Sequence, residues 1–458
     1  MDFSAANTQI WNSIFQIGLI AAAILVANIL RRKIPLIRKT LMPTAVLAGF
    51  LMLLLKFVGL LNLDEDFLEY LTYHCIAIGF IALSLRVPDA PQQKGDMVAL
   101  KSGAIIVSSY AIQGIVGWGI SALLALTIMP TLFPACGGLL PMGYGQGPGQ
   151  ANNIGTSYEM MGFEGGHSFG LALAAAGYIC ACVVGVAYLT ILAKRGKVKG
   201  TNGRDVSGSV TIDTFQSSEE IPIAESLDRF SVQAALVLVV YLVTYLITWG
   251  VTSFLTKYLP GAANMLNSLL WGFNFMIGSG LAILTRWIMV RLKKLKVMTR
   301  QYQNNYLLSR LSGLAFDIMI VAGIASIDLE DLSGLWLPFV LMAVAGGVVT
   351  LIHLQKVCKR VYGDYYYEGL ISMYGMMTGT ISSGILLLRE IDPELKTPAS
   401  NNLVVGSSFA ILLGAPLLLL ITFAAKSLTS TIIAACLCVP YYLILLFIIY
   451  HQKKEKTK

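Results

Sequence analysis

The chain has 458 residues, of which 56% are hydrophobic and only 13% are charged, whereas a soluble domain carries roughly 25% charged residues. This composition excludes an ordinary soluble protein and predicts a membrane protein built from many apolar segments. The net charge of +8 does not indicate nucleic-acid binding, because the basic residues gather in loops predicted on one side of the membrane.

Eleven hydrophobic segments are predicted to cross the bilayer, since a helix needs about 20 mostly apolar residues to span the hydrocarbon core. In chain order they cover residues 10–30, 41–61, 70–85, 102–129, 168–193, 230–258, 265–290, 305–327, 335–355, 400–424 and 431–450. We therefore expect an all-α polytopic membrane protein.

Basic residues predict the orientation of these spans. The residues before the first span carry no Lys or Arg, whereas three basic residues, 31–33, follow it directly. Because cytoplasmic loops are enriched in Lys and Arg, the N-terminus is expected outside and the C-terminus in the cytoplasm. Of the 33 basic residues, only Lys56, Lys257 and Lys426 fall away from the cytoplasmic side in this arrangement.

Two glycine-rich polar stretches, residues 143–157 and 374–384, interrupt the apolar pattern. Non-helical backbone at membrane depth must be covered by protein or line a water-filled cavity. The predicted orientation makes the first stretch the tip of a re-entrant hairpin, about 131–165, that enters from outside. The second becomes the tip of a hairpin, about 363–395, that enters from the cytoplasm.

The two halves are thus predicted to be inverted repeats of five helices, each with one hairpin. The first repeat is expected at residues 1–193 and the second at 230–425, joined by a flexible cytoplasmic linker, 194–229, that is rich in Ser, Thr, Gly and charge. An extra span and a cytoplasmic tail follow at 426–458. Three weak matches in the same order support the repeat: residues 49–50 with 272–273, residues 73–85 with 315–327 without gaps, and residues 138–145 with 369–375.

The glycine-rich tips and the small-residue span from Gly170 to Gly185 resemble the bacterial glutamate–sodium symporters. The resemblance covers about residues 8–425 in span order, hairpin positions and the long central loop. The tips of that family contain histidine, and the two tips here contain none. The resemblance implies sodium-coupled symport of glutamate or a similar small carboxylate, by an elevator-like alternating-access mechanism.

The resemblance also implies a multi-pass protein of the bacterial plasma (inner) membrane that forms a homodimer. Together with the repeat, it predicts that spans 3–5 and 8–10 and the hairpins form a mobile transport body. Spans 1, 2, 6 and 7 would form the scaffold that dimerises.

The hairpin tips are the expected substrate site. The free amides at a helix N-terminus favour carboxylates, and glycine lets the backbone approach a ligand closely. The residues expected to bind substrate are Gly145, Gln146, Gly147, Gly149, Gln150, Asn152, Asn153, Thr378, Gly379 and Thr380. The alternative is that their polar groups only cap broken helices.

Sodium is the expected coupling ion, and it prefers hard oxygen ligands. The residues expected to bind it are Asp317, Thr156, Ser382 and Ser383. Asp317 stands out because it is the only carboxylate well inside a predicted span, where such residues are usually functional. The alternatives for Asp317 are a hydrogen bond inside the packed bundle or a shallower position in the membrane. Glu159, on the return arm of the first hairpin, is a further candidate.

Other classes remain open at this point. A di- or tricarboxylate carrier on a related fold is the nearest alternative, and an ion channel is another because polar hairpins also build selectivity filters. An enzyme is not expected, since the sequence has no H-E-x-x-H pattern and no Gly-x-Ser-x-Gly elbow stands out. No cofactor, no metal beyond sodium and no disulfide is predicted.

Overall fold

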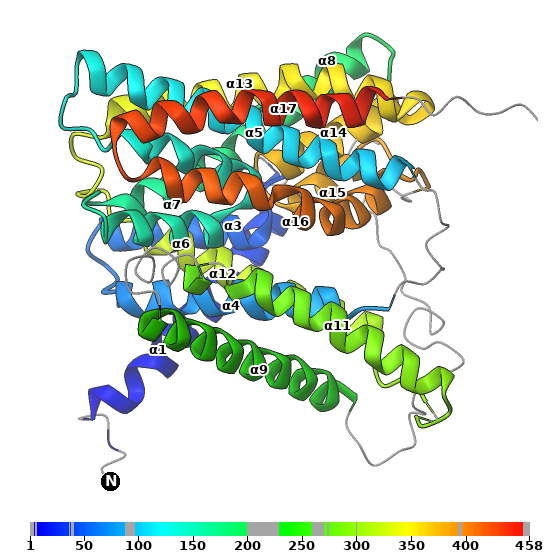
Figure 1. Ribbon diagram of the computed structural model, residues 1–458. Coiled ribbons are helices and arrows are strands. Elements are labelled where there is room, and N and C mark those ends of the chain that lie inside the picture. The colour runs from blue at the N-terminus through cyan, green and yellow to red at the C-terminus, as the bar shows by residue number, and fades with distance from the viewer. Residues whose placement is uncertain are drawn as a thin grey trace, which may run out of the picture. The chain divides into compact units, whose positions relative to one another are not determined.

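The computed structural model (Figure 1) describes residues 4, 7–35, 37, 41–87, 97–198, 229–258, 270–272, 274–298, 300–392 and 396–451. Within this part of the chain every regular element is a helix, which confirms the all-α prediction. Most of the predicted linker, residues 199–228, lies outside the described residues.

The helices follow one another along the chain with few gaps. Their bounds are α1 (Thr8–Lys33), α3 (Thr44–Phe57), α4 (Glu65–Leu85), α5 (Met97–Thr127), η1 (Pro134–Gly138), η2 (Pro141–Gln146), α6 (Pro148–Glu159), α7 (Gly166–Cys180), η3 (Ala181–Gly185), α8 (Val186–Lys194), α9 (Arg229–Tyr258), α11 (Asn274–Lys294), α12 (Asn305–Ala325), α13 (Trp336–Val361), η5 (Gly363–Tyr365), α14 (Tyr366–Met377), α15 (Ile381–Arg389), α16 (Ala399–Ala424) and α17 (Leu428–Tyr450).

Among the described residues, nine helices are long and apolar enough to cross a membrane. The bent pair Ala399–Ser407 and Phe409–Ala424 would raise that number to ten. The chain is therefore a multi-pass membrane protein. Each predicted span overlaps one of these helices except the second, 41–61, which is the short helix α3.

Helix α3 is shorter than predicted because the chain turns at its end. It has 14 residues, fewer than the roughly 20 that span the hydrocarbon core. Gly59 has a positive φ of 72°, and its amide donates to the carbonyl of Lys56. A glycine in this left-handed conformation commonly ends a helix. The apolar residues after it continue the hydrophobic pattern without continuing the helix.

The chain forms two compact units, and both draw on both halves of the sequence. Unit one comprises residues 1–65, 94–205 and 323–458, and unit two comprises residues 66–93 and 206–322. Unit two therefore contains nearly all of α4 and of α12 together with α9 and α11. The predicted grouping was wrong here, because spans 3 and 8 belong with spans 6 and 7, and α1 and α3 belong to the unit that holds both hairpins.

Glycine contacts explain why α4 and α12 belong to unit two. A Cβ added to Gly79 of α4 would lie 2.5 Å from the ring of Phe316 on α12. A Cβ added to Gly278 of α11 would lie 2.8 Å from the side chain of Ile81 on α4. These helices approach so closely that only glycine fits, and the core between them contains Ile81, Val237 and neighbouring aliphatic residues.

Within unit one, α5 is the central helix and packs against α13, α16 and α17. Figure 1 shows α5, α13 and α17 running side by side. The extra C-terminal span is joined to this group by polar contacts as well, since His353 of α13 hydrogen-bonds to Tyr442 of α17 at 3.0 Å and to Ser108 of α5 at 3.0 Å. Helix α6 packs on α7, and α14 packs on α15.

Candidate functional site

Each predicted hairpin contains a helix break at the expected tip. In the first, η2 and α6 are separated at Gly147, whose φ of +86° suits glycine. In the second, α14 ends at Met377 and α15 begins at Ile381. Helices α6 and α15 therefore both have their N-termini at a tip. The sides of the membrane from which the hairpins enter stay a prediction.

The two tips adjoin each other. A Cβ added to Gly147 would lie 3.5 Å from the Cγ2 of Thr380 and 3.7 Å from the carbonyl oxygen of Gly379. It would also lie 3.8 Å from the hydroxyl of Tyr178 on α7. The residues that precede α6 and α15 thus lie close enough for one added carbon atom to bring them into contact, although more than 200 residues separate them in the sequence. We call this place the tip site.

Two helix N-termini direct free backbone amides at the tip site. The first backbone hydrogen bond of α6 is donated by the Ala151 amide to the Gly147 carbonyl at 3.2 Å. The amides of Gly149 and Gln150 come before this bond and are among those that an α-helix leaves without a carbonyl of its own. In α15 the first such bond joins Gly384 to Thr380 at 3.0 Å. Each N-terminus is equivalent to about +0.5 of an elementary charge, and such free amides bind carboxylates and phosphates.

Buried polar side chains without partners gather at this place. Gln150 is only 1% exposed, and neither atom of its amide makes a hydrogen bond within the described part of the chain. The same is true of the Asn152 Oδ1, Thr380 Oγ1 and Ser383 Oγ atoms. Buried polar groups are normally paired, so this concentration indicates a site that binds polar or charged ligands.

The structure brings together most residues that were predicted to bind substrate. Those at the first break are Gly145, Gln146, Gly147, Gly149 and Gln150, and those at the second are Thr378, Gly379 and Thr380. Thr378 also fits the capping alternative, because its hydroxyl donates to the Tyr374 carbonyl at 2.8 Å. Asn152 and Asn153 lie within the first turns of α6, and both are buried.

The predicted sodium ligands are more scattered. Ser383 lies at the tip site, since a Cβ added to Gly379 would lie 2.9 Å from the Ser383 Oγ atom. Thr156 lies about two turns further along α6, roughly 12 Å from its start, so the structure does not bring it to the tip. For Ser382 only the backbone is described.

Asp317 lies in the middle of α12, as predicted, but it belongs to unit two. Its side chain is exposed on that unit, and it makes no hydrogen bond or ion pair among the residues that the structure describes. The predicted alternative of a hydrogen bond inside the bundle is therefore not observed there. Its role in sodium binding stays a prediction.

Sequence reasoning missed several residues that surround the tips. Tyr178 of α7 and Tyr110 of α5 contact the tip glycines Gly147 and Gly145, respectively. Gln113 of α5 donates to the carbonyl of Met377 at 2.9 Å. The signal for Gln113 was present in the sequence, because it is a lone carboxamide in an otherwise apolar stretch of its helix.

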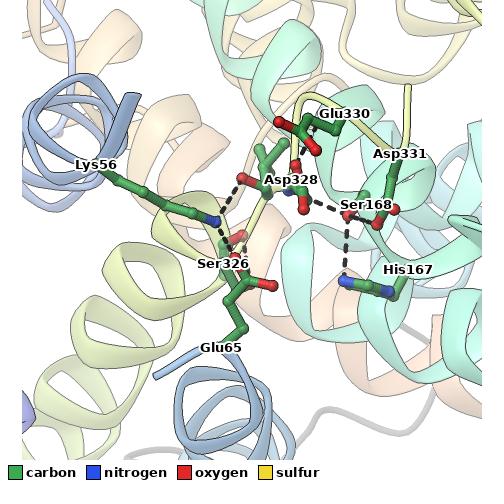
Figure 2. A network of polar contacts seen from close by, with 10 residues as sticks. Lys56, Glu65, His167, Ser168, Ser326, Asp328, Glu330 and Asp331 are labelled. Carbon is green, nitrogen blue, oxygen red and sulfur yellow. Dashed lines mark hydrogen bonds and ion pairs between the residues drawn. The ribbon is translucent and has the colours of Figure 1, made fainter. Parts of the chain in front are cut away.

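A second polar cluster lies at the other end of α6 (Figure 2). Glu159 accepts hydrogen bonds from the backbone amide of His167 at 3.0 Å and from its Nδ1 at 2.6 Å. Ser168 donates to Asp331 at 2.9 Å and accepts from the Asp328 amide at 3.1 Å. Glu159 is thus separated from the tip by the length of α6, so the structure does not place it in the tip site.

The same cluster resembles a serine–histidine–carboxylate relay in its distances, because Ser168 Oγ lies 3.1 Å from His167 Nε2. Ser168 is fully buried, however, at 0% exposure. Its hydroxyl proton is directed at Asp331, and its oxygen already accepts the Asp328 amide. This geometry describes a clamp between α6, α7 and the 326–331 segment, not a nucleophile.

Lys56, in the last turn of α3, also belongs to this cluster. Its Nζ lies 2.5 Å from a carboxylate oxygen of Glu65 and donates to the Ile327 carbonyl at 3.1 Å (Figure 2). Lys56 was one of the three basic residues predicted away from the cytoplasm, and this pairing gives it a local counter-charge.

Acid is expected to weaken the clamp at Glu159. Burial by itself raises the pKa of its carboxyl, but the hydrogen bonds from His167 outweigh that effect and hold the pKa below its usual range. A lowered pKa in the folded state contributes stability above the ordinary glutamate pKa, and this stability is lost as pH falls through the lowered value. Thermal unfolding below pH 4.5 should therefore depend less steeply on pH in Glu159→Gln than in wild type.

The control for this experiment is Glu164→Gln, a neighbouring exposed glutamate. It should keep the wild-type slope. Equal slopes for wild type and Glu159→Gln would show that the Glu159–His167 contact contributes nothing to stability in acid.

A comparison with models of known protein families and with curated protein sequences finds no match for the chain. The fold and the site define a multi-pass membrane protein in which two broken helices meet at buried polar groups.

Proposed function

We propose that the protein is a secondary active transporter that couples sodium entry to uptake of glutamate or a similar small carboxylate. The observation that carries this proposal is the meeting of the α6 and α15 N-termini at Gly147 and Thr380. Many secondary transporters bind an anionic substrate at the N-termini of discontinuous helices.

The substrate carboxylate would be bound by the amides of Gly149 and Gln150 and by those of the first turn of α15. Gln150 and Asn152 would add hydrogen bonds, which their buried, unpaired atoms favour. The side chains named at the tip site are neutral, so they favour a substrate of low net charge over a di- or tricarboxylate. Sodium would be bound by neutral oxygens, including that of Ser383, and by Asp317, Thr156 and Ser382.

The expected mechanism is alternating access of an elevator-like kind, in which the body that carries both hairpins moves across the membrane. By its resemblance to glutamate–sodium symporters, the protein is proposed to form a homodimer in the bacterial inner membrane, with its N-terminus outside. The two inverted repeats, 1–193 and 230–425, belong to this proposal.

The membrane potential can drive uptake only if transport moves net charge, and this constrains the number of sodium ions carried with each substrate. One elementary charge moved inward gains about 2.3 kcal/mol per 100 mV. A monoanion carried with one sodium ion moves no net charge and gains nothing from the potential. We therefore expect more than one sodium ion per monoanionic substrate, and each net positive charge moved inward raises the accumulation about fortyfold per 100 mV.

Counterflow in proteoliposomes tests the proposal. Vesicles loaded with unlabelled glutamate and sodium should take up labelled glutamate transiently, because a carrier exchanges one molecule for another. Net uptake should require an inward sodium gradient and should rise when the inside is made negative. Conduction without exchange would favour a channel, and exchange of citrate or succinate but not glutamate would favour the di- or tricarboxylate carrier.

A further inference from the structure

Gln113 of α5 lies beside both hairpins. It is fully buried, and its Nε2 donates to the Thr350 hydroxyl at 2.8 Å and to the Met377 carbonyl at 2.9 Å. A main-chain carbonyl can only accept a hydrogen bond, so the nitrogen of the amide must face Met377. The orientation of the carboxamide is thereby fixed, and with it the position of its oxygen.

The Gln113 oxygen has no donor among the described residues. It lies beside the first tip, because a Cβ added to Gly145 would be 3.1 Å from it. The ring of Tyr110 lies against the same glycine, 2.3 Å from that Cβ position. A buried acceptor without a donor costs free energy, and a side chain held by two bonds of its own cannot turn away to relieve that cost.

The oxygen lies close to the positive end of α6. Gly145 is two residues from Gly147, so their Cα atoms are at most about 7 Å apart. Free amides at the helix N-terminus favour negative charge, whereas a lone carboxamide oxygen favours a cation or an N–H donor. One end of the tip site is thus suited to an anion, and the neighbouring position to a cation.

We propose that the carboxamide oxygen of Gln113 binds a cation at the tip site, either a sodium ion or the ammonium group of an amino-acid substrate. The ammonium case rests on the transport function proposed above, whereas the sodium case does not depend on the substrate. In both cases Thr350 and Met377 position the amide. In the ammonium case Gln113 also separates amino acids from carboxylates that lack an ammonium group.

Two measurements on the purified full-length protein test this assignment and distinguish its two forms. The first is the thermal unfolding midpoint as sodium replaces choline at constant ionic strength, without substrate. The second is binding of labelled glutamate in saturating sodium, displaced by unlabelled glutamate or by glutarate, which has both carboxylates but no ammonium group. The variant is Gln113→Met, which has nearly the same shape and no amide.

The control variant is Ser108→Ala, which removes a buried hydroxyl from the same helix away from the tip site. It loses the bond to His353, so its unfolding midpoint should fall, but its sodium response and glutamate preference should be those of wild type. If sodium is the ligand, Gln113→Met should raise the half-saturating sodium concentration by about tenfold, the effect of one lost ligand. If ammonium is the ligand, the preference for glutamate over glutarate should fall by about tenfold while the sodium response is unchanged.

A folded Gln113→Met protein with the sodium response and the glutamate preference of wild type overturns the assignment and leaves the transport proposal intact. If the variant does not unfold cooperatively, Gln113→Asn serves instead, because it keeps the amide but withdraws the oxygen by one methylene. Sodium stabilisation that depends on Gln113 without any glutamate binding would support the cation site and contradict glutamate as substrate. A wild-type protein that responds to neither ligand would overturn both.

Discussion

Gln150→Leu is expected to abolish glutamate uptake and at the same time to make the protein more stable. Both atoms of the Gln150 amide are buried without a partner in the described part of the chain, and the side chain is 1% exposed. An unpaired buried polar group costs about 1–3 kcal/mol, whereas an apolar side chain of similar shape avoids that cost. Transport should be lost because the amide is available to the substrate.

The matched control is Gln233→Leu. Gln233 is also 1% exposed, but its Nε2 donates to the Tyr302 carbonyl at 2.7 Å and its Oε1 accepts the Asn304 amide at 3.1 Å. This substitution should lower the unfolding midpoint, since it leaves backbone groups unpaired. Thermal unfolding and sodium-driven uptake would be measured on the same preparations. A Gln150→Leu protein that transports normally would remove Gln150 from the site.

Gly177→Ala is expected to reduce uptake more than tenfold. Gly177 lies in the last turn of α7, and an added Cβ would be 2.4 Å from the carbonyl oxygen of Thr378. That atom is backbone at the second tip, so no side chain can rotate away to make room. Overpacking of this kind typically costs 1–3 kcal/mol. The displacement would reach the place where the two helix N-termini meet.

Gly119→Ala is the control for steric effects, because nothing lies within 4 Å of a Cβ added there. Gly119 is inside α5, where alanine should stabilise the helix by up to about 1 kcal/mol. Uptake would be normalised to the amount of inserted protein for both variants. Normal transport by Gly177→Ala would mean that α7 can shift away from the second tip at no cost to function.

The sequence predicted the helices and both breaks well because their causes are local. Apolar runs specify the spans, and Gly147 followed by Pro148 marks the start of α6 wherever it lies in space. The short α3 was missed because the apolar pattern continues past Gly59, and the turn there depends on one glycine conformation.

Features that depend on contacts between distant segments could not be predicted. The place of Gln113 in the site requires Thr350 and Met377, which follow it by more than 200 residues. The packing of α4 against α12 depends on the close approach of Gly79 and Phe316, which no local sequence pattern predicts. Asp317 was recognised as unusual because it is a carboxylate inside a predicted span, but its position in the sequence does not specify which residues surround it.

Unit two can assemble only after most of the chain has been synthesised, because its helices come from both halves of the sequence. Helix α4 is synthesised early, whereas its packing partners α9, α11 and α12 come from the second half of the chain. At about 5–20 residues per second, the ribosome needs tens of seconds to supply them. During this interval the groove at Gly79 faces lipid or an insertion factor, because Phe316 does not yet exist. Mutations that prevent α9, α11 or α12 from inserting should therefore prolong the exposure of α4 and raise its cleavage by membrane proteases.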